Sequence, residues 1–186
     1  MKSSESAGRF AVRDLVRVAL MAVVISACAR VQIPLGPVSF TMQTFGVFLA
    51  VGLLGGKRGT LSVIVYLLLG AFGAPVFTGF SGGIAKLAGP TGGYLAGFVF
   101  SALIWWGVTK LFGEGPAPSA AGMILGNAAC YAFGTAWFTA VMSGYSFAAA
   151  LSVCVLPFIV PDLCKIALAL AVTHALRDRL RAQHVL

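Results

Sequence analysis

Six long apolar segments, separated by short stretches that hold most of the charged residues, dominate the pattern of the chain. A helix needs about 20 apolar residues to cross a bilayer, so six crossings would use most of the sequence. The pattern therefore predicts an all-α integral membrane protein, a bundle of six transmembrane helices. The predicted crossings lie within residues 15–29, 40–54, 60–72, 93–112, 120–142 and 147–176.

Composition agrees with a membrane location and limits the number of domains. Of the 186 residues, 59% are hydrophobic and 10% are charged, whereas a soluble domain carries about 25% charged residues. Six crossings leave about 66 residues for tails and connections, so we expect a single transmembrane domain over residues 1–186. The net charge of +8 does not indicate nucleic acid binding, because the 13 lysines and arginines lie between apolar runs and form no basic face with interleaved aromatic residues.

Lysine and arginine mark one side of the predicted bundle, and short cytoplasmic loops are enriched in these residues. The opposite side holds only Arg30 and Lys86. We therefore expect both termini in the cytoplasm. The basic positions on the cytoplasmic side lie in the N-terminal tail (1–14), in the connection with Lys57 and Arg58, at Lys110, and in the C-terminal tail (177–186).

Two irregular stretches, residues 33–37 and 73–93, adjoin the short second and third segments on the outer side. Non-helical backbone is tolerated at membrane depth only where it is buried in protein or lines a cavity. The sequence therefore predicts a ligand pocket that opens outward beneath these loops.

Asp162 and Lys165, in the last apolar segment, are the strongest chemical signal. Charged residues inside such segments are costly and usually face a cavity or a partner, and a spacing of three places both on one helix face. A helix that starts near Pro157 puts Asp162 about 8 Å below its outer end. The pair suits a small polar ligand with N–H donors and an anionic or carbonyl oxygen. The alternative is an ion pair that only locks two helices together.

The irregular stretches supply further candidates for ligand contacts. Thr41 and Gln43 could read a hydrogen-bonding pattern, although Ser39 or Thr41 could instead cap the second helix. Glycines in the later stretch let backbone approach a ligand, and its aromatic residues could form an apolar wall; the alternative is tight packing of a re-entrant loop. The candidates there are Phe77, Gly79, Phe80, Ser81, Thr91 and Tyr94.

Signals for an enzyme are weak. Residues 79–83 fit the G-x-S-x-G pattern of serine hydrolases, but Ser81 is expected on the outer side and His174 near the inner side, and a nucleophile and its base must lie about 3 Å apart. The five carboxylates are scattered, so we expect no metal site. Residues 52–58 lack the first glycine and the final serine or threonine of a phosphate-binding loop. We expect neither enzymatic activity nor a cofactor.

Small residues on the first segment could let another helix pack closely. Ala19, Ala22 and Ser26 are spaced three or four apart. The partner could be a helix of the same bundle or a separate subunit.

Four motifs, in order, resemble those of the BioY family, the biotin-specific S components of energy-coupling factor (ECF) transporters. They are residues 33–45 (IPLGPVSFTMQTF), 55–59 (GGKRG), 89–94 (GPTGGY) and 161–165 (PDLCK). The resemblance extends over about residues 15 to 175. It implies a six-helix protein of the bacterial cytoplasmic (inner) membrane, with cytoplasmic termini, that binds biotin with high affinity from outside.

The family resemblance also implies partners and site residues. S components usually work with a transmembrane coupling subunit and two ATP-hydrolysing subunits, and some BioY proteins occur alone and self-associate. By this resemblance, the contact with the coupling subunit would be formed by Ala19, Ala22 and Ser26. The polar end of the biotin pocket would be formed by Asp162 and Lys165. An asparagine-like residue expected after the third helix is replaced here by residues 78–81 (TGFS), with Lys86 as an additional cation. The alternative functions are an S component for another small water-soluble vitamin and an intramembrane serine hydrolase.

Overall fold

Helices make up most of the computed structural model, which describes residues 12–35 and 38–182. In chain order the α-helices are α1 (Val12–Arg30), α2 (Gln43–Ala71), α3 (Ile84–Ala88), α4 (Gly92–Phe112), α5 (Pro116–Val141), α6 (Phe147–Cys154) and α7 (Leu156–Ala182). Two short antiparallel strands, β1 (Gln32–Ile33) and β2 (Phe40–Thr41), precede α2, and a 3-10 helix, η1 (Thr78–Phe80), precedes α3.

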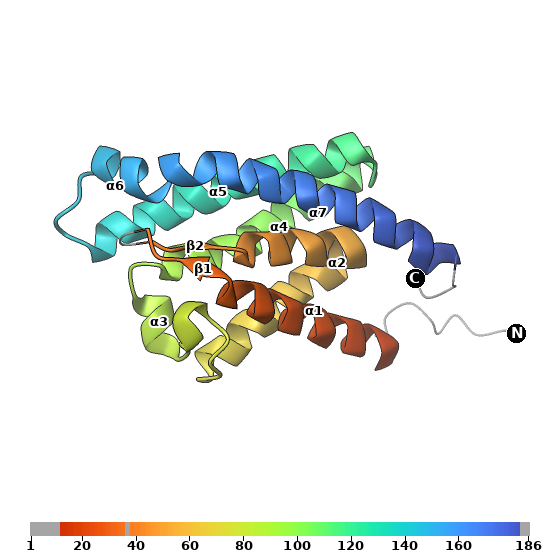
Figure 1. Ribbon diagram of the computed structural model, residues 1–186, viewed down its shortest axis with the longest axis horizontal. Helices are drawn as coiled ribbons and strands as arrows, with labels where there is room; N and C mark the ends of the chain where they lie inside the picture. Colours follow the sequence, from red (N-terminus) through yellow and green to blue (C-terminus); the bar gives the residue numbers. More distant parts are fainter. Residues whose placement is uncertain (1–11, 36–37, 183–186) are drawn as a thin grey trace, which may run out of the picture.

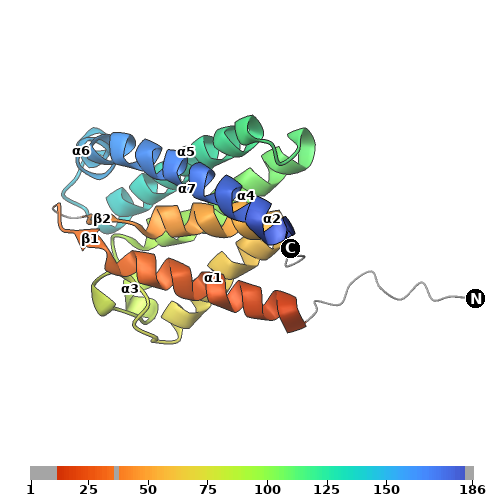
Figure 2. The ribbon, with the colours of Figure 1, turned by 45° about the vertical axis from the view of Figure 1, so that its right-hand side comes forward.

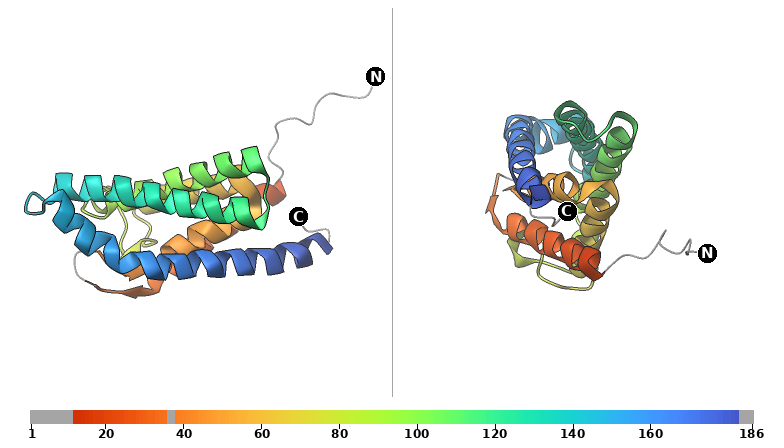
Figure 3. Two further views of the ribbon diagram at one scale, coloured as in Figure 1. Left: turned by 90° about the horizontal axis from the view of Figure 1, so that it is seen from above. Right: turned by 90° about the vertical axis from the view of Figure 1, so that its right-hand side faces the viewer.

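The long helices lie side by side, and the short elements gather at one end of the bundle (Figure 1). We call the end with β1, β2, η1, α3 and α6 the loop end. The opposite end, where α1 begins and α7 finishes, is the tail end; α7 runs along most of the distance between the two (Figure 3).

Four helices in the described part of the chain are long and apolar enough to cross a membrane, so the predicted count of six crossings is not confirmed. They are α2, α4, α5 and α7 as far as Arg177. Large apolar side chains such as Leu103, Phe133 and Leu168 are exposed on the helix faces. Long apolar helices with apolar outward faces are the pattern of a multi-pass membrane protein.

The predicted second and third segments fall in one continuous element, α2, which is interrupted at Gly55. The backbone of Gly55 has φ +76° and ψ 175°, a conformation that is essentially restricted to glycine. A Cβ atom added to Gly59 would lie 2.5 Å from the Cα of Val51, which shows that the helix folds back sharply on itself. Figures 1 and 2 show its second half, in yellow, returning toward the loop end.

The predicted sixth segment, in contrast, is divided into two helices. α6 ends at Cys154, Val155 has non-helical backbone angles, and α7 begins at Leu156. Pro157 therefore lies in the first turn of α7, as expected for a helix that starts near this residue. α1 contains the predicted first segment but is not among the four apolar helices, because Arg13, Asp14 and Arg17 occupy its first turns.

Two ion pairs join elements at the tail end. Arg58, just after the bend in α2, contacts Asp14 of α1 at 3.0 Å. Arg177 of α7 contacts Glu114, in the connection between α4 and α5, at 2.6 Å. These contacts connect α1 with α2, and α7 with the α4–α5 turn.

The small residues of α1 have different environments. Ala22 is fully buried, and Ser26, which is 9% exposed, donates a hydrogen bond to the Ala22 carbonyl at 2.8 Å. Both lie on the face of α1 that packs against α2, where a Cβ on Gly46 would come within 3.0 Å of the Ile25 Cα. Of the two alternatives for Ala22 and Ser26, their burial favours packing against a helix of the same bundle over contact with a separate subunit. Ala19 is exposed.

Candidate functional site

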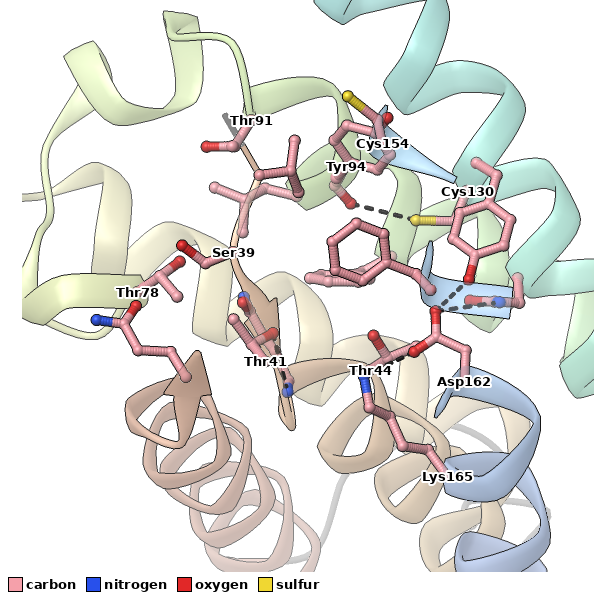
Figure 4. A pocket seen from close by; sticks show the side chains of 18 of the residues that line it. Ser39, Thr41, Thr44, Thr78, Thr91, Tyr94, Cys130, Cys154, Asp162 and Lys165 are labelled. Atoms are coloured by element: carbon pink, nitrogen blue, oxygen red, sulfur yellow. Dashed lines mark hydrogen bonds and ion pairs between the residues drawn. The ribbon is translucent and has the colours of Figure 1, made fainter. Parts of the chain in front are cut away.

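A cavity of about 310 Å³ lies at the loop end, enclosed by the β1–β2 hairpin, the segment with η1 and α3, and helices α4 to α7 (Figure 4). Most of the predicted site residues line it. From the irregular stretches these are Thr41, Gln43, Gly79, Thr91 and Tyr94, and from α7 they are Asp162 and Lys165.

Asp162 and Lys165 form an ion pair inside the cavity wall. The Lys165 Nζ donates to Asp162 Oδ1 at 2.6 Å, and the two side chains are only 5% and 6% exposed, respectively. The same ammonium group lies 4.0 Å from the centre of the Phe40 ring, which adds a cation–π contact from β2. A buried charge pair of this kind keeps both an acceptor and a cation in fixed positions beside the cavity.

Two side chains of α5 hold the other oxygen of Asp162. Tyr131 donates its hydroxyl proton to Oδ2, and Asn127 Nδ2 donates to the same atom at 3.4 Å. Both residues also line the cavity, and sequence reasoning missed them. Their signal was available, because an amide and a phenol four residues apart share one face of an otherwise apolar helix.

The start of α2 contributes polar groups whose positions are fixed by hydrogen bonds. Thr41 Oγ1 accepts a bond from the Gln43 backbone N–H at 3.3 Å. Thr41 therefore lines the cavity and accepts a bond from the first amide of α2, but the N-cap residue is Met42, so neither Ser39 nor Thr41 caps the helix as the alternative expected. The Gln43 amide nitrogen donates to the buried Tyr66 hydroxyl, which in turn donates to the Val76 carbonyl at 3.3 Å.

Of the three aromatic residues predicted to form a wall, Tyr94 lines the cavity, and Phe77 and Phe80 do not. Phe77 is fully buried in the core, with its ring edge-on to Tyr66 at 5.4 Å, and Phe80 is 68% exposed. Neither lines the cavity, whereas Phe98 of α4 and Phe158 of α7 do. The apolar wall therefore comes from residues of the transmembrane helices, which the sequence does not separate from ordinary core positions.

Ser81 also lies outside the cavity lining. Its hydroxyl donates to the Thr78 carbonyl at 2.7 Å. His174 lies nine residues beyond Lys165 in α7, about 14 Å further toward the tail end. The described residues contain no group of three or more His, Cys, Asp or Glu side chains that could hold a metal ion. The arrangement thus favours ligand binding over hydrolysis by Ser81.

The cavity combines three kinds of surface. Asp162 and Lys165 supply charge, hydroxyl and amide groups from the loop end supply hydrogen bonds, and phenyl rings supply an apolar wall. Lys86, on α3, is a second cation in the lining. Such a site suits a small ligand that has polar groups and an apolar body.

Comparisons with known proteins agree with this description. The BioY family model matches residues 1–182. A biotin transporter BioY from Thermotoga maritima is 40% identical over 165 residues, 89% of this chain and 96% of the relative, and a probable biotin transporter BioY from Pyrococcus horikoshii is 39% identical over the same shares. The crystal structure of the S-component for biotin from an ECF-type ABC transporter matches with a TM-score of 0.83 and 30% identity, over 90% of this chain and 92% of that one. These relatives are transport proteins and not enzymes, and the chain belongs to the BioY family.

Proposed function

We propose that this protein captures biotin with high affinity in the loop-end cavity and takes part in its uptake across the membrane. The observation that carries the proposal is the buried Asp162–Lys165 pair in the wall of a cavity of about 310 Å³. The names of the relatives from Thermotoga maritima and Pyrococcus horikoshii support the choice of ligand.

The chemistry of biotin matches the three surfaces of the cavity. Its ureido ring has two N–H donors and a carbonyl, its thiophane ring and valeryl chain are apolar, and it ends in a carboxylate. Asp162 offers an acceptor to N–H groups, and Lys165 and Lys86 offer cations to oxygen atoms. Phe98 and Phe158 provide apolar surface for the body of the ligand.

Titration calorimetry of the purified protein with biotin tests the ligand. We expect one site per chain, with much weaker binding of lipoate, which keeps the valerate carboxylate and lacks the ureido ring, and of biotin methyl ester, which lacks the negative charge. Mass spectrometry of ligand extracted from the purified protein tests the second candidate, another small vitamin. Saturation by such a vitamin without any response to biotin would refute the assignment.

We further propose that uptake uses a transmembrane coupling subunit and two ATPase subunits. The S-component title of the structural neighbour supports this arrangement. The surface that fits a helix of the coupling subunit is the exposed face of α1, where Ala19 lies among Val16, Leu20 and Val23, which are 57% to 61% exposed. A small residue among exposed apolar ones permits close approach of another membrane helix.

Uptake of labelled biotin by cells with and without an energising module tests this arrangement. Ala19→Leu should lower module-dependent uptake and leave biotin binding unchanged, whereas Ala121→Leu, on an exposed position of α5, should change neither. Full uptake without any module would instead favour a solitary, self-associating transporter.

For the location we propose the bacterial cytoplasmic membrane with both termini in the cytoplasm. Arg58 and Arg177 make the two ion pairs of the tail end, Lys57 directly precedes Arg58, and Lys110 lies in the last turn of α4, before the connection with Glu114. Basic residues prefer the cytoplasmic side. Reporter fusions to the two termini should both give cytoplasmic activity. A periplasmic signal from either fusion would overturn this orientation.

A further inference from the structure

Arg30, the last residue of α1, makes two contacts with the segment that covers one side of the cavity. Its Nη2 donates to the Pro75 carbonyl at 3.0 Å, and its guanidinium carbon lies 3.8 Å from the centre of the Phe80 ring. In the described part of the chain no carboxylate pairs with Arg30. The contacts of its charge are therefore those with this carbonyl and this ring.

Phe80 has an unusual backbone conformation. Its φ is +56°, and it is the only residue other than glycine with a positive φ among the residues that the structure describes. The left-handed region is unfavourable for a side chain of this size. Phe80 is also 68% exposed, so burial of its ring in the core does not compensate for the strained backbone. The Arg30 guanidinium contacts this ring, and two hydrogen bonds close the same turn: the Phe77 N–H donates to the Ser81 carbonyl at 2.9 Å, and the Ser81 hydroxyl donates to the Thr78 carbonyl at 2.7 Å.

The strained turn is attached to the cavity lining. Thr78 and Gly79, which directly precede Phe80, both line the cavity. On either side the segment is fixed to the bundle: Phe77 is buried against Tyr66, and the Gly83 N–H bonds to the Gly70 carbonyl at 2.6 Å. The turn at residues 78–80 lies between these two anchors.

The same arginine stands beside the second cover of the cavity. β1 starts two residues after Arg30, and Gln32 of this strand lines the cavity. A Cβ added to Gly79 would lie 3.8 Å from Nε2 of the Gln32 side chain. The β1–β2 hairpin and the 78–80 turn therefore meet close to Arg30. Arg30 therefore joins the 78–80 turn to the end of the helix from which β1 continues.

We propose that Arg30 is a positioning residue of the ligand pocket: its guanidinium clamps the 78–80 turn in the conformation that lines the cavity before the ligand arrives. The proposal rests on the function proposed above for the cavity. Without the clamp, the left-handed Phe80 relaxes, and the ligand has to order the turn when it binds. Preorganised loops bind more tightly mainly because the complex dissociates more slowly.

Binding kinetics of purified Arg30→Gln protein with biotin test the proposal. We expect dissociation about tenfold faster, association changed less than twofold, and a correspondingly higher Kd, because one charge-assisted hydrogen bond and one cation–π contact are lost. Arg58→Gln is the matched control, since Arg58 makes its ion pair with Asp14 at the tail end. Equal changes in both rate constants, with an unchanged Kd, would overturn the positioning role.

Substitutions of Phe80, the ring that Arg30 contacts, test the proposal independently. Phe80→Leu should also speed dissociation, but less than Arg30→Gln does, because the Arg30 bond to the Pro75 carbonyl remains. Phe80→Tyr, which keeps the ring, should retain the kinetics of the wild type. The double variant Arg30→Gln/Phe80→Leu should be no worse than Arg30→Gln alone, since Arg30→Gln already removes the contact with the ring. Additive losses in the double variant would mean that the two residues act separately, and would refute the clamp.

Hydrogen exchange without ligand separates this inference from the assignment of biotin. The amides of residues 76–81 should exchange faster in Arg30→Gln than in the wild type or Arg58→Gln, while exchange in α4 and α5 stays the same. If biotin binds the wild type but Arg30→Gln shows wild-type exchange and dissociation, the clamp is refuted and the biotin assignment stands. If no protein binds biotin, that assignment fails, and unchanged exchange in residues 76–81 would still overturn the clamp.

Discussion

Replacing Asp162 by asparagine separates the role of its charge from the role of its shape. The variant keeps the size of the side chain and leaves the Lys165 ammonium group, which is 5% exposed, without its counter-charge at 2.6 Å. Breaking a buried ion pair by removing one partner costs about 3–5 kcal/mol of folding stability. In a chain of this size each kcal/mol lowers Tm by about 2–4 °C, so we expect a Tm about 6–20 °C below that of the wild type.

Removing the second charge as well should reverse most of this loss. In Asp162→Asn/Lys165→Met no isolated charge is left in the wall of the cavity, and replacing both members of a buried pair is often close to neutral for stability. Binding should behave differently, because neither the anionic acceptor nor the cation is restored. We therefore expect near wild-type Tm and no measurable response to biotin from the double variant.

Thermal unfolding in detergent and calorimetric titration of the same samples measure the two effects. The tail-end pair supplies the control, since Glu114 and Arg177 are also 2.6 Å apart but Glu114 is 44% exposed. Glu114→Gln should cost no more than about 1 kcal/mol and leave the biotin titration unchanged. Wild-type binding by the double variant would refute the pocket assignment, and a double variant as unstable as Asp162→Asn would refute the argument from an isolated charge.

Other substitutions test single features of the fold and site. Gly55→Ala should destabilise the protein by about 1–3 kcal/mol because of its left-handed backbone, whereas Gly107→Ala, where an added Cβ meets no atom within 4 Å, should be neutral or stabilising in thermal unfolding. Tyr131→Phe should weaken calorimetric biotin binding about tenfold, since Asp162 loses a charge-assisted hydrogen bond. The wild type should not react with a fluorophosphonate probe, because Ser81 donates to the Thr78 carbonyl and His174 lies far along α7.

The apolar pattern predicted helices well where one apolar run forms one straight helix. The segments at 93–112 and 120–142 correspond closely to α4 and α5. The pattern did not predict the helix boundaries where the backbone turns within an apolar run, or between two runs that form one element. The bend in α2 depends on the conformation of Gly55, and the break before α7 on Val155; neither changes the hydropathy of its surroundings. Periodicity reports which residues are apolar and does not report backbone angles.

The residues that line the cavity could also be predicted only in part, because hydropathy does not show how side chains pack. A charged pair in an apolar segment stands out in the sequence, so Asp162 and Lys165 could be found. Phe77 and Phe98 look alike in the sequence, yet one ring fills the core beside Tyr66 and the other faces the cavity. That difference arises from the packing of α2 against α4 and the loop, which no local pattern contains.

The geometry of the ion pair also bears on the alternative that it only locks two helices together. Asp162 and Lys165 both belong to α7, three residues apart, so their contact joins no second helix. The link across to α5 consists of hydrogen bonds from Tyr131 and Asn127 to Oδ2 of Asp162, and it needs no lysine. The ion pair itself, with side chains 5% to 6% exposed, therefore has a desolvation cost that its own contact within α7 does not offset by joining two helices. Its position in the cavity wall, where both charges can meet a ligand, accounts for a burial that a helix lock leaves unexplained.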